Sequence, residues 1–319
     1  MIRTAARWLS PGGTRARLSI LIYHRVLPEP DGLFPDVPDL KRFEQELHWI
    51  SRWFHVLPLD EAAARLEAGS LPPRAAAITF DDGYADNATV ALPALQRAGL
   101  SATFFIATSF LDGGRMWNDT VIESVRACHT PWLDLGAVGL GRFAMDGIES
   151  RRKAIGQLLP AIKYLAPAQR DAAVAAVQVA SGECLPDDLM MRSEQVLAMR
   201  RAGMQIGAHT RSHPILARLG DDVAADEISD SKRDLEALLS EPVSLFAYPN
   251  GKPGVDYGAS HARMVQAAGF TAAVSTAPGA ASAHSDRFQL PRFSPWDRGR
   301  TRYGLRMLAN LRGGCGVTA

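Results

Sequence analysis

Short apolar runs alternate with longer amphipathic stretches along most of this 319-residue chain. The runs 18–23 and 75–80 have the length and continuity of buried strands, whereas 40–54 repeats its apolar residues with helical spacing. Strands separated by helices favour parallel pairing through right-handed crossovers. The further predicted strands are 102–107, 204–208, 243–247, 271–275 and 290–293, and the further predicted helices are 60–68, 88–98, 193–202, 222–239 and 260–268. This rhythm predicts an α/β fold with a closed or nearly closed barrel.

Aspartate and glycine residues mark the ends of several predicted helices. Asp60 is expected to cap the helix 60–68, and Asp221 or Asp222 to cap the long helix that follows. Gly99 is expected to end the helix that begins at 88, because glycine readily adopts the left-handed backbone that closes a helix.

The segment 111–190 breaks the strand-helix rhythm. It contains an alternating, glycine-rich stretch, 133–145, that could form a hairpin among three helical stretches, 119–128, 149–165 and 168–180. We expect a mostly helical insertion that packs on the barrel and could shape a substrate groove. The chain then divides into a basic segment 1–17, a barrel domain 18–297 that includes the insertion, and a basic helix or tail 298–319.

Two adjacent carboxylates follow the apolar run 75–80. Asp81 and Asp82 stand at the predicted carboxyl end of a strand, and Gly83 comes next. In barrels of parallel strands the active site gathers at that end, so these acids are candidates for catalysis. The alternative is an ordinary turn in which an aspartate caps the next helix and Gly83 supplies a positive φ.

A pair of histidines, His209 and His213, follows the predicted strand 204–208. Residues four apart can lie on one side of a turn and bind the same metal ion, although this spacing alone is a weak signal. A barrel would bring the histidines to the same rim as Asp81 and Asp82. Two imidazoles and one carboxylate leave positions open for water, as in hydrolytic metal sites.

These two motifs resemble those of the polysaccharide deacetylases with a NodB-homology domain, carbohydrate esterase family four. Thr79-Phe-Asp-Asp-Gly83 matches the first family motif, and His209-Thr-Arg-Ser-His213 matches the second. The resemblance covers roughly 18–293 and implies a distorted (β/α)7-type barrel. It also implies that Asp81 is the general base and that Asp82, His209 and His213 bind one divalent metal ion. Zinc is the first expectation, with cobalt, nickel or iron as alternatives.

The third motif departs from the commonest family pattern. Phe246-Ala-Tyr-Pro-Asn-Gly251 has Ala247 where the family usually has arginine, and it resembles the variant of exopolysaccharide-associated deacetylases. Another group must then orient Asp81, and we expect Arg292 to do so. The turn could aim the backbone N–H of Asn250 at a developing oxyanion, although such a sequence forms turns in many proteins.

Further residues are candidates for contacts with substrate. Tyr248 and Pro249 belong to the third motif, and Trp296 is the tryptophan nearest in order to the family's groove tryptophan. His24 follows the first predicted strand, where it is either a site residue or a hydrogen-bonded core histidine. Trp117 and Asp119 are further candidates for the rim. His284 lies outside any recognisable motif, so the general acid has no assignment.

Composition narrows the choice of partners. A net charge of +1 carries no signature of nucleic-acid binding, although arginines cluster at both ends of the chain. Such clusters favour a solvated surface, with contact with a membrane surface or an anionic polymer as the alternative. Three widely spaced cysteines indicate reduced thiols. No signal-peptide pattern is visible, which predicts a cytoplasmic protein that could associate with the membrane through polysaccharide-synthesis machinery.

The motifs together predict a metal-dependent hydrolase that removes N-acetyl groups from an amino-sugar polysaccharide or its precursor, in exopolysaccharide or cell-envelope glycan synthesis. One alternative is the removal of another acyl group, such as an O-acetyl ester or a small amide. The other alternative is a catalytically silent barrel that binds carbohydrate.

Overall fold

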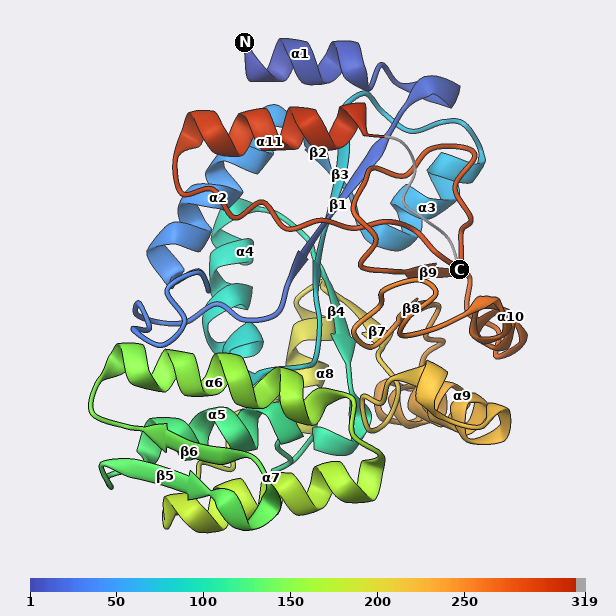
Figure 1. The fold of residues 1–319 in the computed structure, drawn as a ribbon. Helices are drawn as coiled ribbons and strands as arrows, with labels where there is room; N and C mark the ends of the chain where they lie inside the picture. Colours follow the sequence, from blue (N-terminus) through green and yellow to red (C-terminus); the bar gives the residue numbers. More distant parts are fainter. Residues whose placement is uncertain (314–319) are drawn as a thin grey trace.

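A computed structural model describes residues 1–313, so the end of the predicted C-terminal segment 298–319 lies outside the described residues. Seven strands form one parallel sheet in the order β1-β3-β4-β7-β8-β9, with β2 paired to β3 (Figure 1). Their bounds are β1 Leu18–Tyr23, β2 His55–Val56, β3 Ala75–Phe80, β4 Thr103–Ile106, β7 Gln205–Ala208, β8 Leu245–Ala247 and β9 Ala272–Val274. The two-residue β2 escaped prediction because it is too short to show a pattern.

The sheet curls into a half-barrel, which confirms the predicted fold class. The predicted strand 290–293 spans the open side with two single bridges in place of a continuous ladder. Leu290 pairs with Val274 of β9, and Phe293 pairs with Leu21 of β1, both in parallel. This segment therefore joins the two edges of the sheet and places its residues close to β1 and β3.

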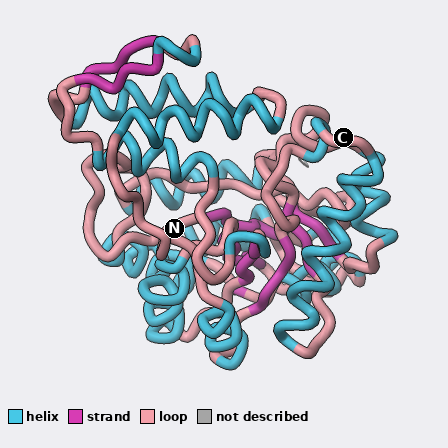
Figure 2. Tube along the Cα trace, turned by 90° about the horizontal axis from the view of Figure 1, so that it is seen from below, coloured by secondary structure: helices cyan, strands magenta, loops and turns pink. Residues whose placement is uncertain are grey.

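Helices cover the outside of the curled sheet, as the pattern predicts (Figures 1 and 2). They are α2 Leu40–Trp53, α3 Leu59–Glu67, α4 Leu92–Ala98, α8 Ser193–Arg201, α9 Asp221–Leu239 and α10 Ala259–Ala267. Gly99 closes α4 with a left-handed φ of 64°, as expected. The predicted helix 88–98 is divided, because a π-helical turn over Asn87–Ala91 precedes α4.

Both predicted aspartate caps are wrong. The N-cap of α3 is Pro58, and the first helical N–H, that of Leu59, donates to the Gln205 side chain instead. The N-cap of α9 is Gly220, so Asp221 and Asp222 lie inside the first turn. There their charges still favour the helix dipole, which is why the sequence pattern placed them near a helix start.

The segment between β4 and α8 forms a separate layer with its own core. It contains α5 Trp117–Ala127, α6 Ile148–Lys163, α7 Pro167–Ser181 and the antiparallel hairpin β5 Trp132–Leu135 with β6 Gly141–Ala144. Buried residues such as Val125, Leu133 and Leu158 pack together inside this layer. The predicted helical stretches and hairpin are therefore present, and the layer lies against one end of the barrel (Figures 1 and 2).

Helix α1 Ile2–Leu9, which the sequence analysis did not predict, lies beside α11 Arg300–Arg312 at the opposite end from α5–α7 (Figure 1). Gly304 makes this packing close, because a Cβ there would lie 2.9 Å from side-chain atoms of Ile2. Within the described residues, none of the helices has both the length and the apolar character needed to cross a membrane.

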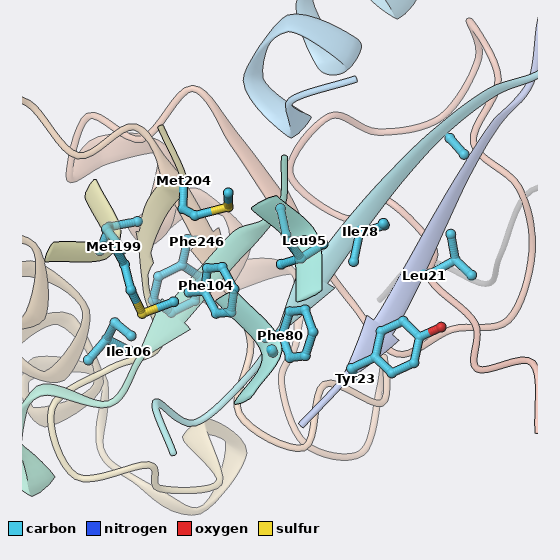
Figure 3. Packing of buried hydrophobic residues seen from close by; sticks show 14 of the residues in the cluster. Leu21, Tyr23, Ile78, Phe80, Leu95, Phe104, Ile106, Met199, Met204 and Phe246 are labelled. Carbon is cyan, nitrogen blue, oxygen red and sulfur yellow. The ribbon is translucent and has the colours of Figure 1, made fainter. Parts of the chain in front are cut away.

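Aromatic side chains fill the centre of the main core (Figure 3). Phe80 stacks on Phe104 with ring centroids 4.7 Å apart, and Tyr23 stacks on the other side of Phe80 at 5.3 Å. These rings come from β1, β3 and β4, so the stack holds together the strands that carry the candidate site.

We expect Phe104→Ala to lower the free energy of unfolding by about 3–5 kcal/mol, because it empties a fully buried ring site. Val179→Ala, at a position 79% exposed, should change it by less than about 0.5 kcal/mol. Urea denaturation followed by circular dichroism would measure both values. Equal losses in the two variants would contradict the packing described for this core.

Candidate functional site

Asp81 lies at the carboxyl end of β3 and is held by Arg292. The guanidinium donates from Nη1 and Nη2 to the two carboxylate oxygens, each at 2.7 Å. Its Nε donates to the carbonyl oxygen of Ser275, and Nη1 also donates to the Thr79 hydroxyl. Arg292 is fully buried, so this bidentate pair is shielded from water.

The charge of Asp81 is stabilised in spite of its burial. Burial alone would raise the pKa of this carboxyl, but the Arg292 guanidinium and His209 outweigh burial and lower it. Asp81 is therefore an ionised carboxylate with fixed orientation at the edge of a cavity. The structure places Arg292 where the sequence analysis expected a substitute for the missing arginine at Ala247.

Asp82, the next residue along the chain, lies close to His209 and His213. Its Oδ1 lies 3.4 Å from Nε2 of His209 and 3.3 Å from Nε2 of His213. That oxygen is buried and has no hydrogen-bond partner among the described residues. A buried, unpartnered carboxylate oxygen between two imidazole nitrogens is the donor set of a divalent metal site, and the three residues could hold one ion.

Hydrogen bonding sets the orientation of His209. Its Nδ1 donates to the carbonyl oxygen of Ala247 at 2.7 Å, which leaves the lone pair of Nε2 directed towards Asp82. Burial would lower the pKa of His209, but the charges of Asp81 and Asp82 raise it overall. Burial lowers the pKa of His213 to about 4, so this imidazole is neutral, as a metal ligand must be.

Strained backbone positions concentrate at this site. Seven non-glycine residues in the described part of the chain have a positive φ, and four of them are Asp82, Thr210, His213 and Asn250. Such conformations cost about 1–3 kcal/mol each, and proteins keep them mainly where function needs them. Their clustering in the three motifs indicates that the motif backbones are arranged for a site rather than for stability.

A cavity of about 360 Å³ opens in front of these residues. Asp81, Asp82, His209, His213, His24, Asn250 and Thr276 line it from the barrel, and Trp117, Asn118, Leu159, Pro160, Lys163, Tyr164 and Arg170 line it from the insertion. The insertion thus forms one wall of the cavity. The sequence predicts a groove-shaping insertion, but no local pattern identifies the residues of α6 and α7 that face the cavity.

A second cavity, of about 410 Å³, adjoins the first. Both are lined by His24, Asp82 and Asn118, so the two hollows meet beside the candidate metal ligands. Trp296 lines the second cavity, is 61% exposed, and carries the Arg306 guanidinium 3.8 Å from its ring centre. The predicted substrate contacts His24 and Trp296 therefore lie at solvent-accessible hollows.

The structure places two predicted substrate contacts elsewhere. Tyr248 is fully buried, stacks on Tyr257 and donates its hydroxyl hydrogen to the carbonyl oxygen of Phe288. Pro249 is also buried and lines neither cavity. These side chains support the turn that presents Asn250, so the predicted direct contact with substrate does not fit their positions. His284 is exposed and also lies outside both cavities.

Asp119 of α5 is a buried carboxyl that contacts Tyr84, a residue on the wall of the second cavity. It accepts a hydrogen bond from the Tyr84 hydroxyl at 3.0 Å, and its Oδ2 has no partner among the described residues. Burial, and then the charge of Asp82, raises its pKa to about 7. The sequence analysis named Asp119 only as a rim candidate, because no local pattern reveals that the side chain turns inward.

The raised pKa of Asp119 makes stability depend on pH. Its ordinary pKa is about 3.9, so folding takes up a proton between about pH 4 and pH 7, and stability falls as pH rises through that window. We expect Asp119→Asn to stabilise metal-free protein at pH 8 by up to about 4 kcal/mol, with little change at pH 4. Urea denaturation in chelator at both pH values, with exposed Asp187→Asn as the control, measures this. A pH-independent effect would contradict the assignment.

Comparison with known proteins identifies the family. The family model described as polysaccharide deacetylase matches residues 68–131 and 159–273. The protein YxkH of Bacillus subtilis (strain 168), whose name places it among the polysaccharide deacetylases, is 24% identical over 279 residues, which is 87% of this chain and 71% of that protein.

Solved structures share the fold. The deacetylase PplD of Streptococcus pyogenes in complex with acetate aligns with a TM-score of 0.58 and 19% identity, over 88% of this chain and 92% of that one. IcaB from Ammonifex degensii aligns with a TM-score of 0.57 and 16% identity, over 90% of this chain and 97% of that one. The family model thus matches more than half of the residues of this chain. The chain therefore belongs to the polysaccharide deacetylase family and is a deacetylase hydrolase.

Proposed function

We propose that this deacetylase is metal-dependent and removes N-acetyl groups from an amino-sugar polysaccharide or its precursor, in exopolysaccharide or cell-envelope glycan synthesis. One observation carries the proposal: an ionised carboxylate held by a buried arginine stands beside an Asp/His/His donor set at the edge of a cavity. The family description as polysaccharide deacetylase and the adjoining second cavity support an extended glycan, because a polymer could lie across both hollows.

Asp82, His209 and His213 would hold the divalent ion, with zinc as the first candidate and cobalt, nickel or iron as alternatives. Such an ion acidifies water and polarises an acyl carbonyl. Asp81 would take the proton of the attacking water, because Arg292 keeps the carboxylate ionised and aligned. The backbone N–H of Asn250, for which the described residues offer no acceptor, would donate to the developing oxyanion.

The departing amine needs a proton when the amide bond breaks. His24 is the remaining imidazole on the wall of the cavity, and unlike His209 and His213 it is exposed. Histidine is the side chain that most often transfers protons in catalysis. We therefore assign this proton transfer to His24, and expect the reaction to release acetate and a glucosamine-type amine.

Acetate release from N-acetylglucosamine oligomers tests the proposal directly. Metal-loaded wild-type protein should release acetate, whereas Asp81→Asn should lose about 10²–10⁴-fold in kcat. His209→Ala should lose both activity and bound metal, measured by atomic emission. Asp187→Asn, exposed and outside both cavities, should behave as wild type.

Two outcomes would redirect the proposal. Release of acetate only from O-acetyl esters or small amides would favour the same chemistry on another acyl substrate. Stoichiometric metal binding without hydrolysis of any of these compounds would favour a barrel that binds carbohydrate without catalysis.

Arg292→Lys tests the role of the buried pair. An ammonium cannot hold both carboxylate oxygens, so we expect kcat to fall about 10²-fold with KM little changed. Loss of the paired hydrogen bonds also leaves the pKa of Asp81 higher, so the acidic limb of the kcat profile should move to higher pH. A proportional loss across all pH values, with a lowered unfolding midpoint, would instead indicate a purely structural role.

A further inference from the structure

Two helices from opposite ends of the chain form one layer, which we call the basic layer: α1 and α11 with their flanking residues 10–17 and 298–299 (Figure 1). The buried faces of the helices hold the layer on the molecule, through Ala6 on α1 and Tyr303, Gly304, Met307 and Leu311 on α11. The terminal arginine clusters, which are separate in sequence, therefore share one surface.

The basic layer has a net positive charge because it contains arginines and no acidic residue. Residues 1–17 and 298–319 contain nine of the 35 basic residues and none of the 34 acidic ones. The intervening residues 18–297 hold 26 basic and 34 acidic residues and have a net charge of −8. The net charge of +1 is therefore the sum of +9 on the terminal segments and −8 on the rest of the chain.

Few of the nine arginines are neutralised. Arg298 lies 3.4 Å from Asp36, and Arg306 pairs with Asp297. The other seven make no ion pair with any residue of the described part of the chain: Arg3, Arg7, Arg15, Arg17, Arg300, Arg302 and Arg312. Arg74, next to the layer, has its pKa lowered first by burial and then by Arg3 and Arg7, so cations crowd together here.

The outward faces of the two helices combine these cations with apolar side chains. On α1, Arg3 and Arg7 are exposed beside Trp8, which is 86% exposed. On α11, Arg302 and Arg312 share an exposed stripe with Leu305, which is 56% exposed. Arginine around exposed tryptophan and leucine is the pattern of helices that lie in the boundary between water and lipid.

We propose that the basic layer docks on a bilayer surface through anionic lipid headgroups, with Trp8 and Leu305 entering the headgroup boundary. Charge complementarity selects an anionic partner, and the exposed apolar side chains select a bilayer over a soluble polyanion. The two helices lie side by side at one end of the molecule, so a bilayer that meets this end could contact exposed groups of both (Figure 1).

Docking would set the orientation of the catalytic cavity. The insertion helices that line this cavity lie at the opposite end of the molecule from α1 and α11 (Figure 1). A docked molecule therefore presents the cavity away from the lipid, where a glycan chain extending from the membrane surface would reach it. This consequence rests on the proposed function, whereas the docking itself does not.

Co-sedimentation of the full chain with vesicles tests the docking. We expect binding to vesicles of phosphatidylcholine mixed with phosphatidylglycerol, and none to vesicles of phosphatidylcholine alone. Binding should weaken as salt is added, because salt screens the attraction between arginines and headgroups. Absence of binding to the mixed vesicles, or equal binding to both kinds, would overturn the proposal. So would binding to a soluble polyanion such as heparin without binding to vesicles.

Charge-reversal variants locate the surface. Each arginine removed from a membrane contact should weaken partitioning about fivefold, so Arg3→Glu/Arg7→Glu should weaken it by roughly 25-fold or more. Arg302→Glu and Trp8→Ser should each weaken it as well. Arg201→Glu, an exposed position on α8, is the matched control and should bind as wild type.

The variants also separate docking from catalysis. None of the substituted residues lines either cavity, so unfolding midpoints and acetate release from soluble oligomers should stay at wild-type values. Loss of vesicle binding with both readouts unchanged would support docking, whatever the substrate of the enzyme is. Full vesicle binding by the Arg3→Glu/Arg7→Glu and Arg302→Glu variants, or an equal loss in Arg201→Glu, would place the contact elsewhere and overturn the proposal.

Discussion

The buried ion pair between Arg292 and Asp81 is the interaction on which the rest of the site depends. Removing one partner from such a pair typically costs about 3–5 kcal/mol, because the other charge is left uncompensated. Arg292 comes from 290–293, the segment that joins the two edges of the sheet. The segment that closes the half-barrel therefore also carries the guanidinium that orients the carboxylate.

This coupling explains how the third motif can lack arginine. Ala247 is buried on β8 and uses its carbonyl oxygen to orient His209, so that strand serves the metal ligands through its backbone. The guanidinium reaches Asp81 from the segment 290–293, between β9 and β1, instead. A planar guanidinium suits this role because its fork donates to both carboxylate oxygens at once. The guanidinium that the third motif lacks is thus supplied from another place in this sequence.

Sequence patterns predicted what depends on local periodicity and missed what depends on tertiary contact. β1 and β3 have the expected bounds because each six-residue run is apolar except for one residue, Ser19 or Thr79, and therefore leaves little choice. The caps of α3 and α9 were wrong because a side chain distant in sequence, or a preceding glycine, replaced the expected aspartate. Motif residues converge as predicted in space, but the burial of Tyr248 and Asp119 follows from packing that no local pattern shows.

The buried carboxylates of the site link cation binding to the stability of the fold. The body of the protein is acidic, and its site holds two buried carboxylates side by side, Asp81 and Asp82. Arg292 compensates one of them within the protein, whereas the Oδ1 of the other has no hydrogen-bond partner among the described residues. Burying a carboxylate oxygen without a partner costs free energy unless a cation binds it. The folded protein therefore favours binding of a cation at Asp82. Binding of a divalent ion there would stabilise the folded state. The positive φ of Asp82 is a backbone strain that costs free energy, and it accompanies the position of that oxygen between the two histidines.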